Sequence, residues 1–217
     1  MAKAVFLDYT GTILQTSGPD IEEMMERFTK GSSFASQQEA VRWWFSELGV
    51  MEEHAYQENY VPEEELCMRI LEKAVREKGL KEDLLQMQRL NVSFWMYAPL
   101  YSDVRYFFEQ CTNPIYIITN NSEEYVKICL RRNGLHANAV ISADSVRAYK
   151  PRRELFEKAL ATAAVEGNDG IMIGDSTRDM EGASSVGMNC ILLDRHKDKG
   201  DSGYRTVHSL REALRLL

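Results

Sequence analysis

The sequence has no long hydrophobic run, no cysteine pair of metal-binding or redox type and no excess of basic residues. No apolar stretch approaches the roughly 20 residues that span a bilayer, and the N-terminal apolar run is short and interrupted by Asp8. We therefore expect neither a membrane-spanning segment nor a signal peptide. The four cysteines show no CxxC or metal-type spacing, which is typical of reduced thiols in a cytoplasmic protein.

The charge of the chain is unevenly distributed. Residues 15–97 hold 16 acidic and 9 basic side chains, whereas the rest of the 217 residues hold 17 of each sign, which accounts for the net charge of -7. An acidic segment beside a neutral one offers no basic surface for nucleic acid or for an anionic membrane. We expect neither as a partner.

Outside residues 15–97, short aliphatic runs of the buried-strand kind alternate with helical patterns. The runs are Ala4–Leu7, Ile115–Ile118, Ala139–Ile141, Ile171–Ile173 and Cys190–Leu193. Ser102 is the expected cap of the helix that follows it. Strands separated by helices predict an α/β fold, a Rossmann-like parallel sheet between helices, whose ligands bind at the carboxyl ends of the strands.

Residues 15–97 have helical patterns only. Ser36-Gln37-Gln38-Glu39 has the sequence of a capping box, and a second helix begins after Pro62 and ends at Gly79. We predict a core formed by residues 1–14 and 98–217, and a helical cap formed by residues 15–97. Because the cap leaves the first strand just after Asp8, it should lie above the carboxyl edge of the sheet.

Several conspicuous features of the cap have structural explanations. We interpret the aromatic clusters Trp43-Trp44-Phe45 and Phe94-Trp95-Met96-Tyr97 as packing within the cap and between cap and core. The acidic run Glu63-Glu64-Glu65 after Pro62 is interpreted as a solvated first helical turn that the helix dipole favours. His54 is interpreted as a surface or structural histidine.

Four short polar elements follow predicted strands or open a predicted helix. They are Asp8-Tyr9-Thr10-Gly11-Thr12, Thr119-Asn120-Asn121, Tyr149-Lys150-Pro151 and Gly174-Asp175-Ser176-Thr177-Arg178-Asp179. Each is common by chance. Together, in this order and with a helical insertion after the first, they resemble the haloacid dehalogenase-like hydrolase superfamily in its small-helical-cap form, and the resemblance covers essentially the whole chain.

The resemblance implies a hydrolase that uses Asp8 as its nucleophile. A phosphate ester attacked by a carboxylate needs positive charge between two anions, and Mg²⁺ prefers carboxylates and carbonyls as ligands. We expect the metal ligands to be Asp8, Asp175 and the backbone carbonyl of Thr10. Asp179, one helical turn after Asp175, is expected to hold a metal-bound water or to orient Lys150.

The same resemblance gives roles to the remaining polar residues. Thr119 is expected to donate a hydrogen bond to the phosphate, and Lys150 to offset the charge on Asp8 and on the phosphoryl group. Asn120 is at a position that often contacts substrate. We expect a monomer, with a cap-mediated dimer as the alternative.

Thr10 departs from the commonest phosphatase form of the first motif, in which a second aspartate moves the proton. A hydroxyl cannot deliver a proton near neutral pH, and general acid–base catalysis contributes about 10²–10⁴-fold. We therefore expect slow hydrolysis of alkyl phosphates unless another group assists, with His54, the cap glutamates and Tyr9 as candidates. Acyl phosphates, whose leaving groups are weak bases, should be less affected.

Our leading hypothesis is a Mg²⁺-dependent phosphatase acting on a small phosphorylated metabolite through phospho-Asp8. One alternative is a phosphate- or metabolite-binding protein with little turnover. A second is a dehalogenase-type hydrolase, which needs neither the metal nor an acid at position 10 and leaves Asp175 unexplained. A third is a phosphonatase-type hydrolase, for which Lys30 is a weak Schiff-base candidate.

Overall fold

The computed structural model describes residues 2–217, and its centre is a sheet of six parallel strands in the order β3-β2-β1-β4-β5-β6. The strands are β1 (Ala4–Leu7), β2 (Ile115–Thr119), β3 (Ala139–Ser142), β4 (Gly170–Gly174), β5 (Asn189–Leu193) and β6 (Arg205–Val207). This confirms the predicted α/β fold with its Rossmann-like sheet. None of the helices in the described part of the chain combines the length and apolar character that a bilayer crossing needs.

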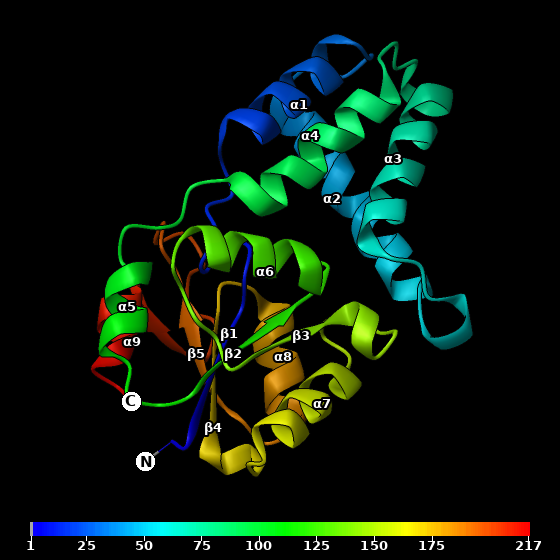
Figure 1. Cartoon of the computed structure of the whole chain (residues 1–217). Coiled ribbons are helices and arrows are strands. Elements are labelled where there is room, and N and C mark those ends of the chain that lie inside the picture. The colour runs from blue at the N-terminus through cyan, green and yellow to red at the C-terminus, as the bar shows by residue number, and fades with distance from the viewer. Residues whose placement is uncertain (1) are drawn as a thin grey trace.

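Helices cover both faces of the sheet (Figure 1). They are α5 (Val104–Gln110), α6 (Glu123–Arg132), α7 (Arg153–Ala163), α8 (Thr177–Ser185) and α9 (Leu210–Leu214). Successive residues of a strand point to opposite faces, so Val5 and Leu7 share one hydrophobic cluster with α5, α6 and α9. Ala4 and Phe6 share the other with α7 and α8. Both faces of β1 are therefore buried, as its unbroken apolar run predicts.

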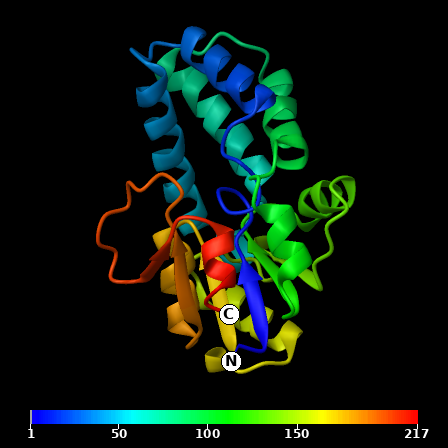
Figure 2. The same ribbon diagram turned by 90° about the vertical axis from the view of Figure 1, so that its left-hand side faces the viewer.

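Four further helices stand beyond the carboxyl ends of the strands, at one end of the molecule in both views (Figures 1 and 2). They are α1 (Pro19–Lys30), α2 (Gln37–His54), α3 (Glu63–Lys78) and α4 (Leu84–Tyr97). We call residues 15–97 the cap; the exact limits of this segment stay a prediction. Its helices lie where an insertion after Asp8 is expected, above the edge that carries the polar motifs.

The helix ends follow the local sequence signals only in part. The Ser36 hydroxyl accepts a hydrogen bond from the Glu39 N–H as predicted, but the Glu39 carboxylate turns to the Ala35 N–H, so the capping box is incomplete. Gly79 ends α3 with the positive φ of 64° that favours glycine. The prediction for Ser102 is wrong because α5 begins after Asp103, and no side-chain cap is formed there.

The packing of α8 against α7 provides a test of the fold. A Cβ at Gly182 would lie 2.0 Å from the ring of Phe156, so Gly182→Ala forces the two helices apart. Overpacking of this kind costs about 1–3 kcal/mol. We expect Gly182→Ala to lower the free energy of unfolding by that amount in urea denaturation.

Gly49 in α2 is the matched control for this substitution. Within residues 2–217 no heavy atom lies within 4 Å of a Cβ added there, and alanine in a helix interior is about 0.5–1 kcal/mol more favourable than glycine. Gly49→Ala should therefore leave stability unchanged or raise it. Equal effects of the two substitutions would contradict the described packing of α7 and α8.

Candidate active site

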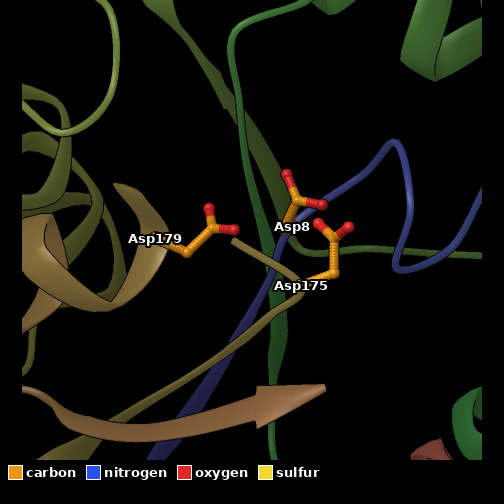
Figure 3. Close-up of side chains that lie close together, drawn as sticks. All are labelled: Asp8, Asp175 and Asp179. Carbon is orange, nitrogen blue, oxygen red and sulfur yellow. The ribbon is translucent and has the colours of Figure 1, made fainter. Parts of the chain in front are cut away.

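Two aspartates follow the two central strands of the sheet. Asp8 follows β1 and Asp175 follows β4, and the Asp8 N–H donates to the Ile173 carbonyl at 3.0 Å. Chain connections run in opposite directions from this pair of strands, which is where α/β sheets open a crevice for ligands. Asp179 on α8 completes a set whose carboxylate oxygens lie within 4.8 Å of one another (Figure 3). We call these three residues the carboxylate triad.

Lys150 is the buried counter-charge of the carboxylate triad. Its Nζ lies 2.7 Å from Asp8 Oδ1 and 2.7 Å from Asp179 Oδ1, and the lysine is 4% exposed. Such a pair needs close geometry to offset its loss of hydration. The triad therefore has three carboxylates around a single buried ammonium group, which leaves it short of positive charge.

Burial and this shortage of positive charge together raise the pKa values of Asp8 and Asp175. Burial, opposed by Lys150 and supported by the charge on Asp179, raises the pKa of Asp8 to about 6. Burial and the charges on Asp8 and Asp179 raise the pKa of Asp175 to about 8. The two carboxylates together raise the pKa of Lys150 above its usual range despite its burial, so the lysine stays charged.

Two local features fix these side chains. Gly11 has a φ of 93°, and a Cβ there would lie 2.4 Å from Asp175 Oδ2, so glycine is needed for both conformation and space. At the start of α8, the Ser176 N–H and hydroxyl donate to Asp179 Oδ2 at 3.1 and 2.6 Å. This capping box leaves the other oxygen of Asp179 facing Lys150.

Asn121 connects the first two motifs to the cap. Its Oδ1 accepts from the hydroxyls of Thr10 (2.9 Å) and Thr119 (3.3 Å), while its backbone N–H donates to Thr119 Oγ1 at 3.0 Å. Its Nδ2 donates to Glu63 Oε2 at 2.7 Å. Thr10 is therefore linked to a carboxylate of the cap through one amide.

Glu52 makes a second polar connection between cap and core. Its Oε1 accepts from Asn120 Nδ2 at 2.9 Å and its Oε2 pairs with Arg178. The Oδ1 of Asn120 accepts from the Lys150 N–H at 3.0 Å. Both ends of the Asn120 amide are thus occupied, and its expected contact with substrate stays a prediction.

A cavity of about 440 Å³ lies between the cap and the carboxyl edge of the sheet. On the core side it is lined by the carboxylate triad together with Thr10, Thr119, Asn120, Asn121, Lys150, Ser176 and Arg178. On the cap side the lining is mostly apolar, from Ile21, Met25, Val41, Trp44, Phe45, Leu48, Cys67, Phe94 and Trp95, with Thr16, Glu52, Glu63 and Asn91 as its polar members. The cavity is lined by all seven residues to which the family resemblance gives a catalytic, substrate or metal role, namely Asp8, Thr10, Thr119, Asn120, Lys150, Asp175 and Asp179.

The cavity corrects two interpretations of the sequence. Trp44 and Trp95 are largely buried, as packing predicts, but both also line the cavity, so the aromatic clusters contribute to the pocket. Glu63, the first residue of α3, turns to Asn121 and the cavity, whereas its neighbours Glu64 and Glu65 are exposed. The solvated-turn interpretation is therefore wrong for Glu63.

The suggested assistants His54 and Tyr9 and the Schiff-base candidate Lys30 do not line the cavity. His54 is exposed, and its ring contacts the Val50 carbonyl of its own helix. The Tyr9 hydroxyl is buried and donates to the Trp95 carbonyl at 2.6 Å. Lys30 pairs with Glu26 on an exposed face of α1 and does not line the cavity. Of the groups suggested to replace an acid at position 10, only cap glutamates, namely Glu52 and Glu63, line the cavity.

The residues present fit a divalent cation. Hard cations bind oxygen ligands, and the carboxylate triad supplies them within a small volume. In the described part of the chain, Asp8 Oδ2 is buried and accepts no hydrogen bond, which a cation ligand would explain. The triad could hold Mg²⁺; the Thr10 carbonyl as an additional ligand stays a prediction.

Sequence reasoning did not assign roles to Glu52, Glu63, Asn121 and Arg178. Arg178 and Asn121 belong to two of the four polar elements, but the residue type alone predicts no role for either. Glu52 and Glu63 are two among many cap glutamates, and only the orientation of α2 and α3 over the sheet distinguishes them.

A family model described as haloacid dehalogenase-like hydrolase matches residues 2–187. The (S)-2-haloacid dehalogenase 4A of Burkholderia cepacia is 24% identical over 149 residues, which are 64% of this chain and 62% of that protein. The match thus spans less than two thirds of this relative.

Two solved structures with low sequence identity share the fold. An L-2-haloacid dehalogenase from Xanthobacter autotrophicus superposes with a TM-score of 0.79 at 16% identity, covering 100% of this chain and 98% of the other. A HAD phosphatase from Thermococcus onnurineus superposes with a TM-score of 0.68 at 23% identity, covering 99% and 97%.

The repulsion within the carboxylate triad predicts a pH-dependent loss of stability without metal. The pKa of Asp175 is about 8 in the folded protein, above its ordinary value of 3.8. Between these values the folded state holds a proton that the unfolded state has released, so stability falls as pH rises. In EDTA at pH 8, Asp175→Asn should raise the melting temperature by about 2–8 °C, or about 1–2 kcal/mol.

Asp201→Asn, on an exposed loop, is the matched control. It loses the same charge away from the triad, and such surface changes stay within about 0.5 kcal/mol. A melting temperature of Asp175→Asn equal to or below that of the wild type at pH 8 would contradict the repulsion.

Proposed function

Because the chain belongs to the haloacid dehalogenase-like hydrolase family, we propose that it is a Mg²⁺-dependent phosphohydrolase acting on a small phosphorylated metabolite. The carboxylate triad is the observation that carries this proposal. Three carboxylates within 4.8 Å share one lysine, an arrangement with an excess of negative charge. A phosphohydrolase needs a divalent cation there, because its nucleophile and its substrate are both anions.

The chain's own residues supply the other requirements of phosphoryl transfer. Lys150 holds Oδ1 of Asp8, so Oδ2, which accepts no hydrogen bond within residues 2–217, is the oxygen open to phosphorus or to the cation. Attack by Asp8 forms an aspartyl phosphate and breaks the bond from phosphorus to the leaving oxygen. Bound Mg²⁺ would supply charge neutralisation between nucleophile and phosphate.

Thr119 and Lys150 hold the transferred group in this proposal. Thr119 ends β2 and is 1% exposed, and it lines the cavity beside Asn121. Its hydroxyl donates to Asn121 Oδ1 at the long distance of 3.3 Å, which leaves it free to turn to a phosphate oxygen. The Lys150 ammonium offsets the charge that remains on Asp8 and the phosphoryl group.

The cap side of the cavity favours a leaving group without negative charge. Its lining is dominated by aromatic and aliphatic side chains, including Trp44, Phe94 and Trp95, and its two carboxyl groups are those of Glu52 and Glu63. A second carboxylate or phosphate on the substrate would be placed against these groups. We infer a small substrate whose non-phosphorylated part is uncharged and at least partly apolar.

A dehalogenase is the second candidate, because two of the similar proteins carry that name and Thr10 would not hinder it. A 2-haloacid brings a carboxylate that needs a cationic partner. Within residues 2–217 the cationic side chains lining the cavity are Lys150 and Arg178. Both are already paired, with the triad and with Glu52, and such a reaction does not need the metal that the carboxylate triad fits.

Phosphate release from acetyl phosphate tests the proposal. With Mg²⁺ the wild type should release phosphate, and EDTA should abolish the release because the triad then has no cation. Asp8→Asn should abolish it as well, a loss of at least about 10³-fold since the nucleophile is removed. Asp201→Asn, an exposed position, should keep wild-type activity.

The competing reaction is followed in parallel as chloride release from (S)-2-chloropropionate. Chloride release that persists in EDTA, together with no Asp8-dependent phosphate release, would overturn the phosphohydrolase proposal in favour of the dehalogenase. Neither product in either assay would leave binding without turnover as the better description.

A further inference from the structure

The phosphohydrolase proposed above still lacks a group that protonates its leaving alcohol. Glu63 is the cap carboxylate that hydrogen bonds connect to Thr10, through the side chain of Asn121. We propose that Glu63 is the general acid of this reaction, in the place that Thr10 cannot fill. The inference rests on the proposed function and adds to it a catalytic residue from the cap.

Geometry connects Glu63 to the reacting centre. Glu63 is the first residue of α3 and lines the same cavity as Asp8. Its Oε2 accepts from Asn121 Nδ2 at 2.7 Å, and the other end of that amide accepts from the Thr10 hydroxyl at 2.9 Å. The Asn121 amide therefore links the Glu63 carboxyl to the Thr10 hydroxyl through two hydrogen bonds, and Oε1 of Glu63 remains to carry a transferable proton.

Glu52, the other cap glutamate that lines the cavity, is less suited to donate a proton. Both carboxylate oxygens of Glu52 have partners, Asn120 and Arg178; burial raises the pKa of Glu52, and these two donors oppose the shift. Glu63 forms no ion pair within residues 2–217, and its carboxylate accepts a hydrogen bond from the neutral amide of Asn121. Only one of the two therefore suits proton donation.

The electrostatic surroundings keep the Glu63 proton in place near neutral pH. Burial, followed by the charge on Glu52, raises the pKa of Glu63 to about 8, and the hydrogen bond from Asn121 opposes the shift only in part. The titratable or charged groups that face Glu63 from the elements around it are Glu52, Asp144, Arg178, Cys67, Tyr60 and Tyr149. A carboxyl group that is protonated at neutral pH and then loses its proton is suited to acid catalysis.

The proton balance of the reaction is simple. An oxygen of Asp8 bonds to phosphorus as the bond to the leaving oxygen breaks, and the electron pair stays on that oxygen. The Glu63 proton moves to it, which releases a neutral alcohol and leaves a Glu63 carboxylate. The water that cleaves phospho-Asp8 returns a proton to Glu63, so the site is restored.

The test compares leaving groups, because an acid matters for an alcohol and little for a weakly basic acyl group. With Mg²⁺, kcat/KM is measured for butyl phosphate and for acetyl phosphate in the wild type and in Glu63→Gln. This ratio of rate constants ends at phosphoryl transfer, so the shared second step does not enter. Glu63→Gln should lower the butyl-to-acetyl ratio by about 10²-fold or more.

Glu65→Gln is the matched control, since Glu65 lies two residues further along α3, is exposed and pairs with Arg69. It should keep the wild-type ratio. In the wild type the ratio should fall as pH rises above about 8, while in Glu63→Gln it should be independent of pH. The ionisation of a group that affects the rates of both substrates equally does not change this ratio.

The outcomes separate this inference from the function beneath it. If acetyl phosphate gives no Asp8-dependent phosphate release, both the proposed function and the role of Glu63 are wrong. Asp8-dependent release from acetyl phosphate, with a ratio unchanged by Glu63→Gln or with no turnover of butyl phosphate by the wild type, would overturn the role of Glu63 alone. A parallel loss for both substrates would show that Glu63 holds the cap in place instead.

Discussion

The buried ammonium group of Lys150 is the interaction on which the rest of the site depends. It lies between Asp8 and Asp179, at 2.7 Å from each, and so holds the end of β1 against the start of α8. Removing one partner from a buried ion pair is far more costly than the pair is favourable. Within residues 2–217 this contact leaves Asp175 without an ion-pair partner, and in the proposed function a divalent cation would take that place.

A second consequence concerns the cap. The cap contacts the core through carboxylates as well as apolar surface, because Glu52 meets Asn120 and Arg178 while Glu63 meets Asn121. Asn120 and Asn121 in turn contact Lys150 and Thr10. The position of the cap over the motif residues therefore depends on two hydrogen-bond networks, one through Asn120 and one through Asn121, and residues of both line the cavity.

Much of this arrangement is predictable from the sequence because its signals are local. Apolar runs of three or four residues predict five of the six strands, and parallel strands bring their carboxyl-end residues to one edge. The strand β6 (Arg205–Val207) has no such signal, since it is three residues long and includes an arginine. Ser102 was assigned as a cap on residue type alone. Asp103 takes its place, and its carboxylate is bound to Arg195 and to the Leu210 N–H.

The parts of the site that the sequence does not predict depend on how the cap meets the core. Nothing in the pattern of α3 distinguishes Glu63 from Glu64 and Glu65, which have the same charge and the same favourable position near the start of the helix. The aromatic residues of the cap were assigned to packing, yet Trp44 and Trp95 are buried in the hydrophobic core and also line the cavity. Contacts between residues 50 to 100 positions apart decide both cases.

The central claim is that Asp8 forms a covalent phosphoryl intermediate with the help of a divalent cation. The most direct measurement is the intact mass of the wild-type protein after acid quenching of a brief reaction with acetyl phosphate, followed by peptide mapping. We expect one phosphoryl group on Asp8 when Mg²⁺ is present and none in EDTA. A phosphoryl group on another residue, or equal labelling of Asp8 in EDTA, would contradict it.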